Sequence, residues 1–242
     1  MNLVFLVNYD LPALLALNRI VPACMEHNIQ IFYTQKPISD LCPALRQLGE
    51  FEVQALETTS SLLSFKKMGA IALNEINTDD FARYAATAPD VVVSIRHMSI
   101  LQAPAIAVPK LAVLNLHSGL LPDYKGVMST FRALCHHEAT IGTTLHTIEN
   151  ADIDRGPIIV RSQTPAQFDK SYFWNVLNLY PEGSRNVIEA ITQLNAGMPL
   201  TSKPQQDRGQ YYTFPTATEI DVAPVSLFAQ DDIEYLDQFL ND

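Results

Sequence analysis

Two polar side chains end an otherwise apolar run between Leu111 and His117. The run has the composition of a strand, in which alternate side chains share a face, so Asn115 and His117 should lie side by side. An amide and an imidazole at the carboxyl end of a parallel strand stand where α/β proteins bind ligands. The pair therefore predicts a binding or catalytic site. The alternative is that Asn115 bonds loop backbone and His117 is a buried histidine whose hydrogen bonds are satisfied by its neighbours.

A second polar cluster occupies residues 147–156 and contains Asp152 and Asp154. Its Asp-x-Asp spacing suggests calcium, but an EF-hand loop starting at residue 150 needs Gly in place of Arg155 and Glu in place of Arg161. The calcium interpretation therefore fails. The cluster is either a solvated acidic loop or the source of an aspartate that the fold brings beside the Asn-x-His pair.

Other kinds of site are not expected. His136 and His137 are adjacent, so on a helix they point about 100° apart and do not chelate one metal ion together. Cys135 falls in a helical apolar pattern and is expected in the core. Neither GxGxxG nor GxxxxGK[ST] is present, and Val7 to Asp10 stands where the glycines of a dinucleotide-binding loop would follow the first strand. We predict neither a metal site nor a dinucleotide site.

The segments that must position these residues alternate between strand and helix patterns. Val91 to Val93 is a continuous β-branched run, typical of a strand buried on both faces of a parallel sheet. The expected strands cover residues 3–7, 29–34, 91–93, 111–117, 143–148 and 158–160. The first expected helix carries Leu14, Leu17, Val21 and Met25 on its apolar face, and the others cover residues 79–86, 128–138, 169–179 and 181–195. This alternation predicts an α/β fold with a doubly wound, mostly parallel Rossmann-like sheet and right-handed crossovers.

Capping residues and prolines predict where helices begin and end. Asp10 should cap the first helix, with Pro12 in its first turn, and Pro22 should kink or interrupt it. Thr78 should cap the helix of residues 79–86. The segment from residue 36 to residue 48 contains two prolines and is expected to form a loop plus a short helix.

The pattern changes after Gly197, where the last long helix is expected to stop. We predict a main, catalytic domain of residues 1–197 and a small C-terminal extension of residues 198–242. The extension should contain a strand or hairpin at Tyr211 to Phe214 and a terminal amphipathic helix at Asp232 to Leu240. Its aromatic residues crowd a segment too short to build a core, so we expect it to mediate a homodimer.

The composition limits the class of partner. The chain has 242 residues, of which 48% are hydrophobic, and a formal charge of −10. This charge repels phosphate backbones and anionic membranes, so neither nucleic acid nor a membrane is an expected partner. Residues 1–7 are too short and too uncharged for a signal peptide, and no apolar run reaches the roughly 18 residues that span a bilayer. Cys24, Cys42 and Cys135 indicate reduced thiols, so we expect a cytoplasmic protein.

Four motifs in register resemble those of the 10-formyltetrahydrofolate-dependent formyltransferases. In the order of that family's signature, the chain carries Asn115-x-His117, Leu120 to Gly126, Gly142 to His146 and Asp154-Arg155-Gly156. The resemblance implies a formyltransferase fold and transfer of the formyl group of 10-formyltetrahydrofolate to a primary amine. It also implies that Asn115, His117 and Asp154 are catalytic. Asn115 and protonated His117 would stabilise the developing oxyanion, while Asp154 would raise the pKa of His117 and help to relay a proton.

The same resemblance implies where the folate binds. One segment follows the strand of residues 91–93 and the other is a loop that closes the pocket. Together they comprise His97, Met98, Ser99 and Ile100, with Asn150, Ala151, Asp152 and Ile153. Taken alone, the first segment is an ordinary turn at the end of a strand. The chain departs from the family at Gly119, where a serine is usual.

The branches of this family differ in the amine that accepts the formyl group. Methionyl-tRNA formyltransferases add a basic C-terminal domain, whereas the residues after Gly197 are acidic here, and the glycine-rich phosphate loop of the glycinamide ribonucleotide enzymes is missing. The chain is most similar to the sugar N-formyltransferases, which act on nucleotide-linked amino sugars. A non-catalytic folate-binding relative is the alternative of a different class. Lys125, Arg132 and Arg155 should hold the pyrophosphate, unless they are surface charges paired with carboxylates.

Overall fold

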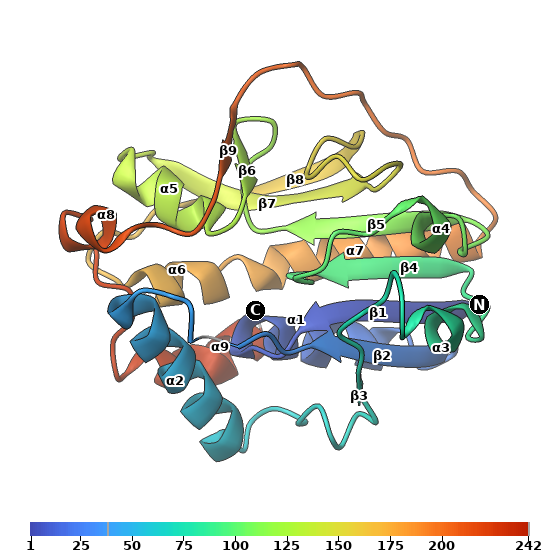
Figure 1. Cartoon of the computed structure of the whole chain (residues 1–242), viewed down its shortest axis with the longest axis horizontal. Coiled ribbons are helices and arrows are strands. Elements are labelled where there is room, and N and C mark those ends of the chain that lie inside the picture. The colour runs from blue at the N-terminus through green and yellow to red at the C-terminus, as the bar shows by residue number, and fades with distance from the viewer. Residues whose placement is uncertain (38, 242) are drawn as a thin grey trace.

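The computed structural model describes residues 1–37 and 39–241; position 38 of the expected loop and position 242 of the expected extension lie outside the described residues. A seven-stranded sheet forms the centre of the molecule (Figure 1). Five strands are parallel, and the last two are antiparallel. In spatial order they are β3 (Ile71–Ala72), β2 (Asn28–Thr34), β1 (Asn2–Asn8), β4 (Val91–Ile95), β5 (Ala112–His117), β7 (Thr140–Thr147) and β8 (Ile158–Pro165). The predicted doubly wound, mostly parallel sheet is confirmed.

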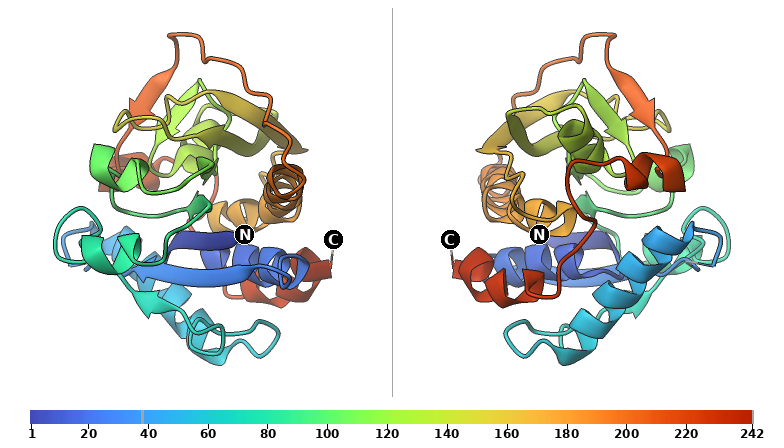
Figure 2. Two further views of the ribbon diagram at one scale, coloured as in Figure 1. Left: turned by 90° about the vertical axis from the view of Figure 1, so that its right-hand side faces the viewer. Right: turned by 90° about the vertical axis from the view of Figure 1, so that its left-hand side faces the viewer.

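Helices cover both faces of the sheet (Figure 2). Alternate residues of β1 enter two separate apolar clusters, Leu3 and Phe5 on one face, Val4 and Leu6 on the other. The larger cluster includes residues of α1 (Leu11–Ala23), α2 (Pro43–Thr58), α5 (Ser129–Cys135), α6 (Tyr172–Leu177), α7 (Tyr180–Asn195) and α9 (Leu236–Asn241). The smaller one is closed by α3 (Phe81–Ala85) and α4 (Ala103–Ile106). Within the described ranges, no helix combines the length and apolar composition needed to cross a bilayer.

Asp10 and Pro22 mark the two ends of α1 as predicted, but Met25 falls outside the helix. The Asp10 carboxylate accepts a hydrogen bond of 2.9 Å from the amide of Ala13, and Pro12 lies in the first turn. The helix ends at Ala23, one residue after Pro22. Met25, expected on its apolar face, is therefore 78% exposed.

Two other helix predictions were wrong. The segment expected to hold only a short helix contains α2, a helix of 16 residues. It begins at Pro43 because proline is tolerated in a first turn, where its missing amide hydrogen has no partner to lose. Helix α3 begins after Asp80 rather than Thr78, and Asp80 uses its carboxylate to accept bonds from the amides of Asn74 and Glu75.

The C-terminal residues pair with a segment from the middle of the chain. Of the strand or hairpin expected at Tyr211 to Phe214, the strand is formed: β9 (Gln210–Tyr212) pairs in parallel with β6 (Tyr124–Gly126) in a separate two-stranded sheet. The chain then passes through α8 (Ala217–Asp221) and the 3-10 helix η1 (Asp232–Tyr235) to α9 (Figure 1). Helix α9 lies against α1 and α7. Strand β9 thus completes the turn that follows β5.

Candidate active site

Asn115, His117 and Asp154 come together on one face of the sheet. Leu114 and Leu116 of β5 enter the larger apolar cluster, so Asn115 and His117 point the other way. The Nδ2 atom of Asn115 donates to Oδ1 of Asp154 over 3.2 Å, and Nδ1 of His117 lies 3.4 Å from Oδ2 of Asp154. His117 ends β5, but Asn115 lies within the strand. The cluster therefore spreads over the sheet face and is not confined to its carboxyl edge.

Asp154 reaches this position through an unusual backbone. Its φ is 54°, in the left-handed region that most L-residues avoid. Two residues later, a Cβ atom on Gly156 would lie 1.7 Å from the carbonyl oxygen of Thr147, so only glycine allows the loop to pack so closely on the end of β7. Asp154 is also held by β6, because its Oδ2 accepts a hydrogen bond of 2.7 Å from the amide of Gly126. The Asp-x-Gly motif thus folds a loop back over β5.

The Asp154 carboxylate is ionised although it is only 7% exposed. Burial raises its pKa, but the neighbouring rings of His117 and His146 and the amide of Gly126 outweigh burial and lower the pKa to about 2. The buried negative charge of Asp154 therefore lies against two imidazole rings.

His146 also belongs to this cluster. It ends the Gly142 to His146 motif, but no role was predicted for it from the sequence. It lies opposite Asn115 in the antiparallel register of β5 and β7. Its Nδ1 donates to the Thr147 carbonyl over 2.8 Å, so in the neutral ring Nε2 accepts from Nδ2 of Asn115 over 3.0 Å. Both amide hydrogens of Asn115 therefore point to His146 and Asp154. This leaves Oδ1 as the acceptor atom of the Asn115 side chain.

Ser129 is a second residue that the sequence analysis missed. Nε2 of His117 must donate to the carbonyl of Tyr124 at 2.7 Å, because a carbonyl only accepts, and Oγ of Ser129 lies 3.1 Å from the same nitrogen. A Cβ atom on Gly119 would lie 2.6 Å from the Ser129 Cβ and 2.7 Å from His117 Nε2. The absence of a side chain at Gly119 is what allows His117 and Ser129 to meet.

The proposed folate residues lie in two segments, both half-buried to exposed. Burial lowers the pKa of His97 to about 4, and neither ring nitrogen makes a protein hydrogen bond of normal length and angle. The Met98 amide donates to Thr34 Oγ1 over 3.4 Å. Ser99 bonds the Asn74 carbonyl, and Ile100 is 54% exposed while its carbonyl accepts from Asn77. The residues of the second segment are exposed or half-buried: Asn150, Ala151, Asp152 and Ile153.

The three cations expected to bind pyrophosphate are separated by their partners. Lys125 is buried and its Nζ donates to the carbonyl of Arg208, and burial lowers its pKa. The Arg132 guanidinium pairs with Glu219 and lies 5.3 Å from the centre of the Tyr212 ring. Both side chains therefore hold the C-terminal segment. Only Arg155 stays on the surface, 3.2 Å from an exposed Asp207 carboxylate.

Comparisons with known proteins agree on one family. The sequence model of the family described as formyl transferase matches residues 50–172. The methionyl-tRNA formyltransferase of Jannaschia sp. (strain CCS1) is 26% identical over 81% of this chain and 60% of its own length. That of Pseudomonas paraeruginosa (strain DSM 24068 / PA7) is 33% identical over 50% of this chain and 39% of its own length. The chain thus spans 60% or less of these curated relatives.

Solved structures show the same fold at low sequence identity. A sugar N-formyltransferase from Shewanella sp FDAARGOS_354 matches with a TM-score of 0.60 and 17% identity, covering 87% of this chain and 76% of that one. Glycinamide ribonucleotide transformylase 1 from Symbiobacterium toebii matches with a TM-score of 0.59 and 20% identity, covering 85% and 95%. At such identities the likeness establishes the fold and leaves the acceptor open.

Proposed function

Because this chain belongs to the formyl transferase family, we propose that it transfers the formyl group of 10-formyltetrahydrofolate to the primary amine of a nucleotide-linked amino sugar. The observation that carries the proposal is the convergence of Asn115, His117 and His146 on the ionised, buried Asp154. Such a cluster offers hydrogen bonds for a reacting amine and a place for its proton. Formyl transfer requires both.

The residues act on an amine that attacks the formyl carbon. A new bond forms between the amine nitrogen and that carbon, the bond from the carbon to the donor's N10 breaks, and one proton passes from the amine to N10. Oδ1 of Asn115 accepts a hydrogen bond from the attacking amine and orients it. His117, which lies beside Asp154, stabilises the charge that develops on the formyl oxygen. Asp154 orients the His117 ring and helps to relay the proton.

The donor would be held by the segments that follow β4 and β7. His97 suits this role because its ring nitrogens are shielded from solvent and lack well-formed protein hydrogen bonds, which a polar pteridine edge would supply. Met98, Ser99 and Ile100 continue that wall, and the loop of residues 150–153 would close the opposite side. The bound donor supplies the formyl group, and these residues orient it.

The charge of the chain supports a small acceptor. At −10 it repels a polyanion such as tRNA, whereas a nucleotide-sugar needs only a local cation. Arg155, next to Asp154 and on the surface, is the first candidate for that contact; Lys125 and Arg132 would contribute only if their present partners were displaced. Methionyl-tRNA is the second candidate acceptor, because the curated relatives named above carry that activity in their names.

A panel assay tests this assignment. The full chain is incubated with 10-formyltetrahydrofolate and, in parallel, nucleotide-linked amino sugars, the free amino sugars, glycinamide ribonucleotide and methionyl-tRNA, and products are identified by mass spectrometry. We expect formylation of a nucleotide-linked sugar and no formylation by Asp154→Asn. Preferred formylation of the ribonucleotide, the tRNA or the free sugars would reject the proposed acceptor, and no transfer to any amine would reject formyl transfer itself.

We also propose a cytoplasmic homodimer. The three cysteines are free, in keeping with a reducing compartment. Tyr211 and Phe214 are 48% and 38% exposed on the C-terminal segment, and exposed aromatic groups of this kind support contact with a second copy.

A further inference from the structure

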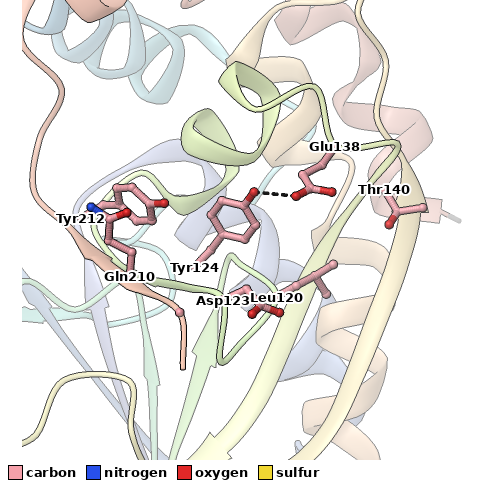
Figure 3. Close-up of a pocket in the computed structure, with 8 residues that line it drawn as sticks. Leu120, Asp123, Tyr124, Glu138, Thr140, Gln210 and Tyr212 are labelled. Atoms are coloured by element: carbon pink, nitrogen blue, oxygen red, sulfur yellow. Dashed lines mark hydrogen bonds between the residues drawn. The ribbon is translucent and has the colours of Figure 1, made fainter. Parts of the chain in front are cut away.

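A cavity of about 680 Å³ lies beside the turn that follows His117 (Figure 3). It is lined by residues of the turn, by the residues just before and at the start of β7, and by β9. Its volume is within the range of about 300–1,000 Å³ found for small-molecule sites. None of the residues assigned to chemistry or to folate lines it, so its occupant is not yet accounted for.

Two tyrosines give the cavity an aromatic wall. The rings of Tyr124 and Tyr212 have centroids 5.9 Å apart and planes inclined by 19°. The Tyr124 hydroxyl donates to Oε1 of Glu138 over 2.8 Å, which fixes the ring and directs one carboxylate oxygen to the same region (Figure 3). Aromatic faces of this kind receive the C–H face of a sugar ring or a cation.

The charged groups of the cavity select against phosphate. Asp123 and Glu138 line it, and no lysine or arginine does so among the residues that the structure describes. Two cations beside lining residues have carboxylate partners, since Arg208 pairs with Asp123 and Arg132, which lies over the Tyr212 ring, pairs with Glu219. Carboxylates accept hydrogen bonds from hydroxyls and attract an ammonium, and they repel a pyrophosphate.

The cavity is coupled to the catalytic cluster by one residue. Tyr124 contributes its ring to the cavity wall, and its carbonyl accepts the hydrogen bond of 2.7 Å from Nε2 of His117. Two residues on, the amide of Gly126 bonds Asp154. A molecule seated against Tyr124 therefore lies next to the backbone that fixes both proposed catalytic side chains.

We propose that this cavity binds the hydroxyl-bearing ring of an amino sugar at a site separate from the cluster of Asn115, His117 and Asp154, so this inference does not depend on which amine accepts the formyl group. The ring packs on Tyr124 and Tyr212, and its hydroxyls donate to Asp123 and Gln210. Glu138 attracts its ammonium group. A phosphate or pyrophosphate attached to the sugar stays outside the cavity.

Binding to the full chain tests the site without any formyl donor. Titration calorimetry uses three probes: a free amino hexose, its N-acetylated form and inorganic pyrophosphate. We expect saturable binding of both sugars, tighter for the amino form, and no competition by pyrophosphate. Tyr212→Ala should weaken both sugars at least tenfold, and Glu138→Gln should weaken the amino form alone. Tyr211→Ala is the matched control, because Tyr211 is adjacent and exposed and does not line the cavity.

Three results would overturn the site: no saturable sugar binding, displacement of the sugar by pyrophosphate, or equal affinities in wild type and Tyr212→Ala. Thermal unfolding checks that Tyr212→Ala is folded. If that variant does not fold, Glu138→Gln provides the test, because a glutamine side chain still accepts the hydrogen bond from the Tyr124 hydroxyl. Transfer assays separate this inference from the proposed function. If the formyl group goes only to a non-sugar amine while Tyr212→Ala still abolishes sugar binding, the acceptor is wrong and the sugar site stands.

Discussion

Three features of Asp154 destabilise the folded state: its burial, its negative charge and its left-handed backbone. Each would destabilise an isolated aspartate, the backbone alone by roughly 1–3 kcal/mol. They are offset by the amide of Gly126 and by the rings of His117 and His146. Strained residues that the surrounding structure holds in this way concentrate at functional sites.

Substitution of His117 or Asp154 should lower the rate of formyl transfer without weakening the binding of the formyl donor. We expect His117→Ala and Asp154→Ala each to lower kcat by about 100-fold, because both act on charge that develops in the transition state. The dissociation constant for a folate analogue should change little, since His97 to Ile100 are intact. Single-turnover kinetics and fluorescence titration measure the two effects. Wild-type turnover in Asp154→Ala would show that another group carries the proton.

Ser129 should act as a positioning residue for His117. Ser129→Ala removes the hydroxyl 3.1 Å from Nε2, so we expect kcat to fall roughly tenfold and the acidic limb of its pH profile to move. Thr130→Val is the matched control, because that neighbouring hydroxyl bonds the carbonyl of Ser118 instead. Equal pH profiles for Ser129→Ala and wild type would leave Ser129 a packing residue only.

A second buried charge cluster lies behind the first strand. The Arg96 guanidinium pairs with Asp10 at 2.7 Å, and Glu52 of α2 lies buried close to both. Burial, together with the charge of Asp10, raises the pKa of Glu52 from 4.5 to about 8 in spite of Arg96. One cation is thus balanced by one carboxylate, and Glu52 holds its proton at neutral pH.

Glu52 should make stability depend on pH. Its folded pKa is above its unfolded value, so the folded chain binds the proton more tightly and the free energy of unfolding falls as pH rises from about 4.5 to about 8. Glu52→Gln mimics the protonated side chain and should remove this fall, which leaves the variant more stable at pH 8 by about 2 kcal/mol. Urea unfolding at several pH values measures it. Glu57→Gln, on the exposed side of α2, is the control and should keep the wild-type slope.

At the scale of elements, local pattern predicted what depends on local chemistry. The run at Val91 to Val93 predicted a strand because β4 is buried on both faces, and Asp10 predicted a helix start because it caps one. The sequence does not predict which strands pair when they lie far apart along the chain. His146 joins the site only through the register of β7 on β5, and β9 pairs with a turn far earlier in the chain, so neither has a local signal.

The pairing of β9 with β6 should depend on Gly209. Its φ is 81°, and a Cβ atom there would lie 1.9 Å from the carbonyl oxygen of Pro122. We expect Gly209→Ala to destabilise the chain by about 2–3 kcal/mol and to release β9 from the turn. Gly197→Ala is a close control, because Gly197 has a φ of 71° with nothing within 4 Å of its Cβ position, and it should cost only about 1 kcal/mol. Denaturant unfolding compares them, and equal losses would mean that the close approach to Pro122 is unimportant.

At the scale of the whole molecule, the C-terminal segment contacts several separate elements of the fold. Lys203 forms a bridge with Ile158 of β8, β9 joins β6, and Arg19 of α1 donates to carbonyls of α9. Three separated parts of the chain are thereby tied together. The aromatic residues of this segment differ in their environment. Tyr212 packs on Tyr124, whereas Tyr211 and Phe214 are exposed.

The exposed pair should carry the proposed dimer contact. We expect the intact chain to sediment as a dimer at micromolar concentration and the double variant Tyr211→Ser, Phe214→Ser to sediment as a folded monomer. Circular dichroism checks the fold of the variant. A monomeric wild type under the same conditions would rule the homodimer out.

The parallel pairing of Tyr124–Gly126 with Gln210–Tyr212 also sets an order of events during synthesis. A ribosome releases the chain from its amino end, and early segments begin to fold before later ones emerge. Strands β1 to β8 can assemble while the last helices are still being made, yet the turn beside His117 lacks its neighbouring strand until Tyr212 has emerged. A nascent chain can therefore pair the strands of its main sheet before the turn beside His117 gains its neighbouring strand.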